Sequence, residues 1–210
     1  MSSTALVKTI EKLKSGYVGK LVAKRAQEFK DMGKRGNESW FSELCFCILT
    51  ANSTAKLGMK IQRALGSEFL TIPKEELRSR LRGFGHRFYN KRSEFIVSAR
   101  KFSGIKDIIT KFPKAQLARE WLVENVGGIG YKEASHFLRN VGFDGLAILD
   151  RHILALMREH ELIEQAPRTL TRRRYLKIEE KLKVLAEKVN LPLAELDLYL
   201  WYLKTGEVLK

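Results

Sequence analysis

The most informative stretch of the sequence is glycine-rich and lies between two apolar segments: Leu122-Val-Glu-Asn-Val-Gly-Gly-Ile-Gly-Tyr-Lys-Glu-Ala134. We expect one helix to end near Val126 and a second helix to begin at about Tyr131. Three glycines lie between these points, and glycine both adopts positive φ and lets another backbone approach closely. The stretch therefore predicts a tight turn that joins two helices.

The start of the second helix is also a candidate phosphate site. The N–H groups of a first helical turn have no partner inside the helix and carry partial positive charge. They can bind a phosphate without any cationic side chain. Taken alone, the stretch also fits a plain turn between helices that binds no ligand.

The rest of the chain is ordinary for a globular protein except in its charge. Its 210 residues are 44 % hydrophobic and 30 % charged, which fits one compact unit or two small domains. No apolar run is long enough for a membrane span and no secretory pattern opens the chain, so we expect a cytoplasmic protein. With 39 Lys and Arg against 24 Asp and Glu, the net charge is +15. That charge favours nucleic acid as the partner, although a merely solvated basic surface is the alternative.

The two cysteines exclude a class of cofactor. Cys45 and Cys47 lie in the apolar run Leu44–Leu49, and we expect both thiols to be buried. Two thiols cannot hold a four-cysteine zinc site or iron–sulfur cluster. We expect no metal and no organic cofactor for this chain, and the sequence does not reveal whether a monovalent ion binds the hairpin carbonyls.

Apolar residues recur at helical spacing along most of the chain. One such set is Trp40, Leu44, Cys47, Ile48 and Ala51. No run alternates apolar and polar residues as a half-buried strand would. The pattern predicts an all-α protein.

The glycine turn, a lysine and an aspartate together form a wider pattern. Val126–Gly130 fills the apolar-x-Gly-apolar-Gly spacing of the helix-hairpin-helix motif, which binds the DNA backbone without reading its sequence. Lys132 follows in the second helix, and Asp150 lies downstream, before Arg151-His152. This arrangement resembles the helix-hairpin-helix DNA glycosylase superfamily, in which a lysine at the position of Lys132 marks the bifunctional members.

Both side chains fit the implied chemistry. A lysine attacks C1′ of a sugar only as the neutral amine, which a helix N-terminus and partial burial both favour. The resulting Schiff base makes C2′ acidic, and β-elimination then breaks the bond to the 3′ phosphate. Lys132 is the candidate nucleophile. Asp150, a predicted helix N-cap, is the candidate electrostatic and general-base partner for the oxocarbenium-like sugar.

The resemblance is more specific over nearly the whole chain. The chain is similar to the type 2 8-oxoguanine DNA glycosylase/lyase family, found mainly in archaea, over residues 40–52, 85–89, 128–142 and 196–202. This family lacks the iron–sulfur cluster and the extra β-domain of other relatives, in agreement with the cysteine count and the absent strand signal.

The family implies two α-helical domains that flank a DNA-binding cleft. One domain is expected from residues 1–36 and 150–210, and the other from 37–149, with the helix-hairpin-helix motif at about 118–141. Lys132 and Asp150 would face each other across the cleft, and Gly128 and Gly130 would contact the DNA backbone.

The resemblance also implies residues that handle DNA around an extruded base. Extrusion leaves a hole in the duplex. Asn52 matches a polar side chain that relatives insert, and His86 and Arg87 match a wedge and an arginine that contact the partner base. His152 matches a phosphate contact. The plainer alternatives are a helix cap for Asn52, phosphate binding for Arg87 and core packing for His152.

Recognition of the damaged base points to the end of the chain. 8-Oxoguanine carries an N7–H donor that guanine lacks, so an acceptor for this hydrogen discriminates best. Asp197 and Trp201 are four residues apart and share a helix face. The resemblance implies that the last residue, Lys210, enters the base pocket. The alternatives are core packing for Trp201 and a frayed terminus for Lys210.

The resulting prediction is a monomeric, bifunctional glycosylase and β-lyase that excises 8-oxoguanine from double-stranded DNA and also acts on abasic sites. One alternative is a glycosylase/lyase for oxidised pyrimidines, which the missing cysteine cluster disfavours. Another is a non-catalytic helix-hairpin-helix protein, which would need neither Lys132 nor Asp150. The sequence leaves open the opposite-base preference, action on single strands and the ratio of the two activities. It also leaves open which surface cations bind phosphates among Arg78, Arg80, Arg82, Lys91, Arg92, Arg168 and Arg172–Arg174.

Overall fold

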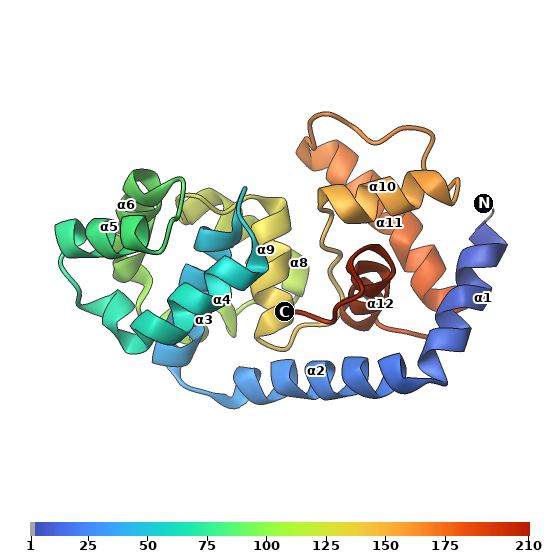
Figure 1. Cartoon of the computed structure of the whole chain (residues 1–210), viewed down its shortest axis with the longest axis horizontal. Coiled ribbons are helices and arrows are strands. Elements are labelled where there is room, and N and C mark those ends of the chain that lie inside the picture. The colour runs from blue at the N-terminus through green and yellow to red at the C-terminus, as the bar shows by residue number, and fades with distance from the viewer. Residues whose placement is uncertain (1–2) are drawn as a thin grey trace. The chain divides into compact units, whose positions relative to one another are not determined.

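The computed structural model describes residues 3–210, so Met1 and Ser2 of the expected first domain lie outside the described residues. Over this range the chain forms α-helices and short 3₁₀ helices without a strand, which confirms the all-α prediction (Figure 1). In chain order the elements are α1 (Ser3–Lys14), α2 (Tyr17–Lys34), α3 (Asn37–Thr50), α4 (Ala55–Leu65), η1 (Gly66–Leu70), α5 (Lys74–Gly83), α6 (Tyr89–Ala99), η2 (Arg100–Phe102), α7 (Ile105–Ile109), α8 (Ala115–Asn125), α9 (Tyr131–Asn140), α10 (Arg151–Glu159), α11 (Arg172–Lys188) and α12 (Leu193–Thr205).

Local sequence signals explain several helix ends. The side-chain oxygens of Thr54 and Thr171 accept hydrogen bonds from the first turns of α4 and α11. Pro192 directly precedes α12, where its fixed φ suits a helix start. Gly206 closes the same helix in the left-handed conformation, with φ of 75°.

The described chain divides into two compact units. Unit 1 comprises the chain up to Phe29 together with Gly142–Lys210, and unit 2 comprises Lys30–Val141. The sequence-based boundaries lie a few residues further along the chain, at 36/37 and 149/150.

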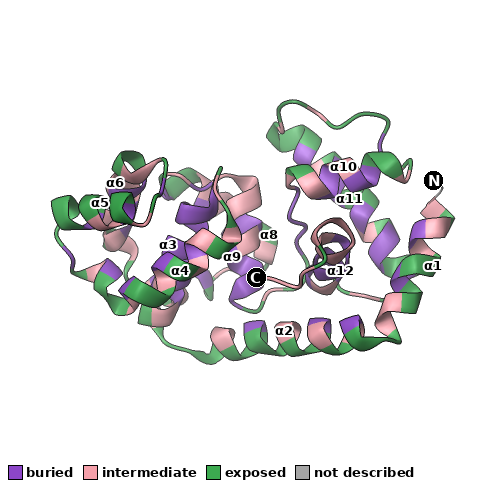
Figure 2. Ribbon diagram, viewed as in Figure 1, coloured by how far each residue is buried: buried purple, intermediate pink, exposed green. Residues whose placement is uncertain are grey.

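Helix α3 is the centre of unit 2. It packs against α4, α6, α7 and α9, and most of its length is buried (Figure 2). Both cysteines lie on it and are fully buried, as predicted, and burial raises the pKa of the Cys45 thiol well above its usual value. The helix is therefore a rigid support for the segments at its two ends.

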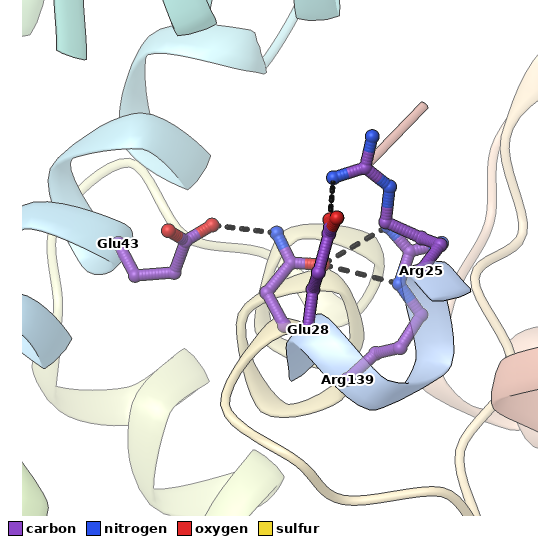
Figure 3. A network of polar contacts seen from close by, with 5 residues as sticks. Arg25, Glu28, Glu43 and Arg139 are labelled. Atoms are coloured by element: carbon purple, nitrogen blue, oxygen red, sulfur yellow. Dashed lines mark hydrogen bonds and ion pairs between the residues drawn. The ribbon is translucent and has the colours of Figure 1, made fainter. Parts of the chain in front are cut away.

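A buried polar network joins α3 to α9 and α4. The carboxylate of Glu43 accepts hydrogen bonds from Asn140 at 2.7 Å and from Gln62 at 3.0 Å. The side-chain oxygen of Asn140 in turn accepts two bonds from the Arg139 guanidinium, at 3.1 and 3.0 Å (Figure 3). Buried polar groups are costly unless they are paired, so this network fixes how α9 lies on α3.

Unit 1 contains α1, most of α2, α10, α11 and α12, and α12 is in contact with both α10 and α11. The extended segment Leu146–Leu149 is buried and runs directly into α10. Two side chains of α11 hold its backbone. Glu179 accepts from Ala147 N–H at 2.9 Å, and the Tyr175 hydroxyl donates to Ala147 C=O at 2.7 Å. Because this segment is fixed, the first residue of the following helix is also fixed.

Residues 3–210 contain neither of two kinds of feature, a membrane-spanning helix and a metal-binding cluster. In this range no helix has the length and apolarity that a bilayer span requires. Nor do three or more His, Cys, Asp or Glu side chains gather as a metal ion would require, within the same range.

Candidate active site

The hairpin turn forms where the glycine spacing predicted it, between the end of α8 at Asn125 and the start of α9 at Tyr131. Gly128 has φ of +82°, a conformation that favours glycine. A Cβ atom at Gly128 would lie 2.4 Å from the Phe95 ring on α6, and one at Gly127 would lie 3.0 Å from it. The glycines are therefore required both by the backbone conformation and by close packing on α6.

Lys132 lies in the first turn of α9, and its side chain is 26 % exposed. Its Nζ lies 2.9 Å from Oε1 of Glu133, whose side chain is 14 % exposed. The other oxygen of Glu133, Oε2, accepts from the Gly130 N–H at 3.3 Å. We expected the hairpin N–H groups to point outward for a phosphate. The Gly130 N–H instead donates within the hairpin.

Asp150 is the N-cap of α10, as the sequence predicted. Its Oδ1 accepts from the N–H groups of His152 at 2.9 Å and Ile153 at 2.8 Å. Both bonds are made to Oδ1, and Oδ2 takes part in neither of them. The buried segment before it, held by α11, fixes the position of this charge in unit 1.

Asn52 lies exposed just beyond the C-terminus of α3, with φ of +57°. Two side chains bind the last carbonyls of α3. The Arg92 guanidinium donates to Ala51 C=O at 2.6 Å, and His86 Nε2 donates to Leu49 C=O at 2.9 Å. Helix C-termini leave such carbonyls without partners, so these bonds fix the end of α3 that presents Asn52.

His86 does not face solvent, contrary to what a wedge requires. Only 1 % of it is exposed, and its Nδ1 accepts from the Phe88 N–H at 3.2 Å. Burial lowers the pKa of His86, against the opposing effect of its bond to Leu49. The buried imidazole therefore stabilises the loop around His86 through its hydrogen bonds to Leu49 and Phe88. Its neighbour Arg87 is exposed and stacks over the Phe88 ring at 4.4 Å.

Arg92 departs from another expectation. We counted it among surface cations that could bind phosphates, but it is buried beneath the end of α3. Its guanidinium also lies over the rings of Phe88 and Phe95, at 5.8 and 5.7 Å. Burial lowers the pKa of Arg92, and the charge of Glu133 opposes that shift. Arg92 therefore connects the Asn52 loop electrostatically with the hairpin.

The remaining predicted residues lie in unit 1. The rings of His152 on α10 and Trp201 on α12 meet edge to face, with centroids 5.1 Å apart. The buried Trp201 Nε1 has no hydrogen-bond partner among the described residues. Asp197, one turn earlier on α12, is buried, and Lys210 is half-buried. The structure thus brings His152 against Trp201, two residues that sequence reasoning gave separate roles.

Sequence reasoning missed the supporting residues around both candidate catalytic groups. Glu133 had a detectable signal, because a glutamate three residues after a helix N-cap often bonds back to the cap N–H. Arg92, Phe95, Tyr175 and Glu179 had no comparable signal. Their contacts join segments far apart in the chain.

Taken together, the fold and the site define an all-helical protein of the helix-hairpin-helix class, with a lysine at the start of the hairpin's second helix. A family model described as 8-oxoguanine DNA glycosylase matches residues 22–191. The chain belongs to this family.

Individual relatives match over essentially the full chain. The 8-oxoguanine DNA glycosylase/AP lyase of Methanocaldococcus jannaschii is 57 % identical over 205 residues, covering 98 % of this chain and 99 % of the relative. The crystal structure of the M. jannaschii 8-oxoguanine glycosylase/lyase in complex with a 15mer DNA containing 8-oxoguanine has a TM-score of 0.97 at 56 % identity, covering 98 % of this chain and 100 % of that one. The crystal structure of the 8-oxoguanine DNA glycosylase of Thermotoga maritima has a TM-score of 0.94 at 44 % identity, covering 99 % of this chain and 100 % of that one.

Proposed function

We propose that this chain is a bifunctional DNA repair enzyme, which excises 8-oxoguanine and then cleaves the strand 3′ to the abasic site by β-elimination. The observation that carries the proposal is Lys132 in the first turn of α9, beside the hairpin turn, in a chain of this family. A non-catalytic hairpin protein would need no lysine there. The family match disfavours the alternative of an oxidised-pyrimidine enzyme.

Lys132 is the proposed nucleophile. As a neutral amine it attacks C1′ of the damaged nucleotide, the base departs, and the lysine remains attached as a Schiff base. The imine draws electrons from C2′, so loss of a C2′ proton expels the 3′ phosphate. This covalent chemistry uses only the side chain and requires no metal or organic cofactor.

Asp150 is the proposed electrostatic partner. Loss of the base places positive charge on the sugar, and a fixed carboxylate stabilises that charge without having to reorganise. Two backbone N–H groups hold Oδ1, which fixes the carboxylate in position. The same carboxylate is the proposed general base of the later steps.

Unit 2 supplies the proposed DNA-handling groups. The hairpin at Gly128 and Gly130 contacts the backbone, and exposed Asn52 enters the space left by the extruded base. Arg87, also exposed, contacts the widowed partner base with its planar guanidinium. For His86 we propose a positioning role, because its bond to Leu49 C=O supports the loop that carries Asn52.

Unit 1 supplies the proposed base-recognition groups Asp197, Trp201 and Lys210, with His152 as a phosphate contact. A buried donor without a partner carries a free-energy cost, and a ligand that accepts its hydrogen bond removes this cost. The Trp201 indole N–H is such a group. An acceptor that faces the N7–H of 8-oxoguanine would supply the discrimination against guanine.

The proposed partner is double-stranded DNA that contains 8-oxoguanine or an abasic site, bound by a monomer in the cytoplasm. A net charge of +15 supports a polyanionic partner and a strong salt dependence of binding. No membrane partner is proposed.

Borohydride trapping tests the proposal. A labelled duplex with one 8-oxoguanine opposite cytosine is incubated with the protein and borohydride, beside an undamaged duplex and the Lys132→Gln variant. A covalent adduct on the lesion alone, absent with the variant, is the expected result. If DNA binds but no adduct forms, the chain is not an 8-oxoguanine lyase. A panel of oxidised pyrimidines then separates another lesion specificity from binding alone.

A further inference from the structure

The ion pair between Lys132 and Glu133 places a carboxylate on the atom that must react. Nζ and Oε1 are 2.9 Å apart, and both side chains are largely shielded from solvent. An ammonium group has no lone pair, so Nζ must lose a proton before it can attack C1′. A group within hydrogen-bonding distance of that proton meets the geometric requirement for a general base.

The other side of the Glu133 carboxylate is held in place. Oε2 accepts from the Gly130 N–H at 3.3 Å, which ties the carboxylate to the hairpin turn. The charge of Arg92, buried on α6, attracts it as well. Because these interactions restrain the carboxylate on the Oε2 side, Oε1 is oriented toward Nζ.

We propose that Glu133 is the general base that accepts the proton of Lys132 Nζ when the nucleophile forms. This inference rests on the proposed Schiff-base function. It assigns Glu133 a catalytic role beside Asp150, whose role is to stabilise the sugar.

The proton and electron balance of the step is as follows. One Nζ proton moves to Glu133 Oε1, which leaves a neutral amine and a carboxylic acid. The amine lone pair forms the bond to C1′, and the glycosidic bond breaks with its electron pair on the departing base. The proton held by Glu133 reaches that base through solvent, and Glu133 is ionised again. Opening of the sugar ring then moves a second Nζ proton to the ring oxygen and leaves the Schiff base.

Exclusion of water by DNA makes this transfer easier. In the free protein, water reaches only the exposed fraction of each side chain, 26 % for Lys132 and 14 % for Glu133, and stabilises the two charges there. When a duplex covers the hairpin, both charged forms lose that solvation, and the neutral pair becomes accessible. The nucleophile therefore forms mainly when DNA is bound, which protects the free enzyme from side reactions.

Other charged groups face α9 from α3, α6 and α8. From α3, which packs on α9, Glu43 accepts from Asn140 at the far end of α9. Arg92 faces Glu133 from α6. From α8, the buried Arg119 lies over the Tyr131 ring at 5.4 Å, and Glu120 accepts from the Tyr131 hydroxyl. The pH dependence of adduct formation is therefore compared between the parent protein and variants changed only at Glu133, so that these neighbouring charges stay the same.

The test measures the single-turnover rate of borohydride-trapped adduct on the 8-oxoguanine duplex. Glu133→Gln retains an oxygen for the Gly130 N–H and nearly the same shape, but it cannot accept a proton at neutral pH. Glu133→Asp retains a carboxylate on a shorter side chain. Glu124→Gln, an exposed glutamate on α8, removes the same charge away from Nζ.

We expect Glu133→Gln to trap about a hundredfold more slowly than the parent protein at pH near 7, with DNA binding unchanged. Its deficit shrinks toward about pH 10, where solvent itself deprotonates an amine. Glu133→Asp recovers part of the rate, and Glu124→Gln matches the parent. A Glu133→Gln rate within about threefold of the parent, or a deficit equal at every pH, overturns the inference. The rate of the parent protein tests the proposed function separately. If the parent protein forms no adduct, the Schiff-base function itself is contradicted; if only the Glu133 variants behave unexpectedly, the role of Glu133 alone is contradicted.

Discussion

Helices α9 and α10 begin in opposite ways, and the difference explains how each carries its candidate catalytic group. Helix α9 starts at a glycine, and its first turn bears a long side chain whose Nζ is paired with Glu133. Helix α10 starts at Asp150, whose own carboxylate is the cap.

The start of α9 leaves the side chain of Lys132 able to move, whereas the start of α10 fixes the carboxylate of Asp150. Lys132 must travel to a sugar carbon and form a bond, and a chain of four methylene groups held by one ion pair permits that. Asp150 acts from a fixed position, as a charge beside the sugar and as the proposed general base of the later steps, and two backbone hydrogen bonds below 3 Å hold it there. Variants of each residue therefore fail in different ways.

The largest expected effect comes from Lys132→Gln. Removal of the amine removes the nucleophile, so the trapped adduct falls by about a thousandfold or more. Binding of the lesion duplex persists, because the hairpin glycines and the positive surface remain. Gel-shift titration and trapping on the same samples separate the two properties, with the exposed Lys111→Gln as the matched control. Trapping by Lys132→Gln at the rate of the control would contradict the assignment.

The next effect separates the charge of Asp150 from its capping role. Asparagine caps helices about as well as aspartate, whereas alanine costs about 1 kcal/mol. Asp150→Asn is expected to melt close to the parent temperature yet to release the base about a hundredfold more slowly. Asp150→Ala is expected to lose both stability and rate. Base release by Asp150→Asn at the parent rate would leave Asp150 with a capping role only.

Gly128→Ala tests the hairpin turn that precedes α9. The new Cβ meets the Phe95 ring at 2.4 Å, and φ of +82° disfavours alanine, so we expect a loss of about 1–3 kcal/mol in unfolding free energy. Weaker DNA binding should accompany it. Gly83→Ala is the control, because nothing lies within 4 Å of its Cβ and its φ is not positive. Equal melting temperatures for the two variants would refute the packing argument.

The smallest effect concerns His86 and pH. Burial lowers the pKa of His86 below its usual 6.5, so the unfolded chain binds a proton at this position more readily than the folded chain. This contribution to stability is present above about pH 6.5 and is lost as the pH falls toward the lower folded pKa. The stability advantage of the parent over His86→Gln should therefore shrink on acidification. Thermal melts of both proteins across that range measure it, and a constant difference would contradict it.

Local patterns in the sequence were sufficient for much of the fold and for two site residues. The glycine spacing predicted the turn before α9, and Asp150 before an apolar helical pattern predicted an N-cap. Both features depend on residues adjacent in the chain, so the sequence carries them directly.

Contacts between distant segments were not predictable in the same way. Nothing adjacent to His86 shows that its ring binds Leu49 C=O from within, or that Arg92 holds Ala51 C=O. Both residues look like surface groups in the sequence, and only the packing of α6 and of the loop before it on α3 buries them. The bond from the Gly130 N–H to Glu133 is different, because it is local and its capping pattern was present in the sequence.

Mapping the cross-link identifies the residue that attacks the sugar. After borohydride trapping on the 8-oxoguanine duplex, the adduct is digested with nuclease and trypsin, and the modified peptide is sequenced by mass spectrometry. A sugar remnant on Lys132 blocks cleavage there, so we expect a peptide that runs from Glu120 to Arg139 with Lys132 modified. A remnant on any other amine, such as Lys210, with unmodified Lys132 would contradict the account.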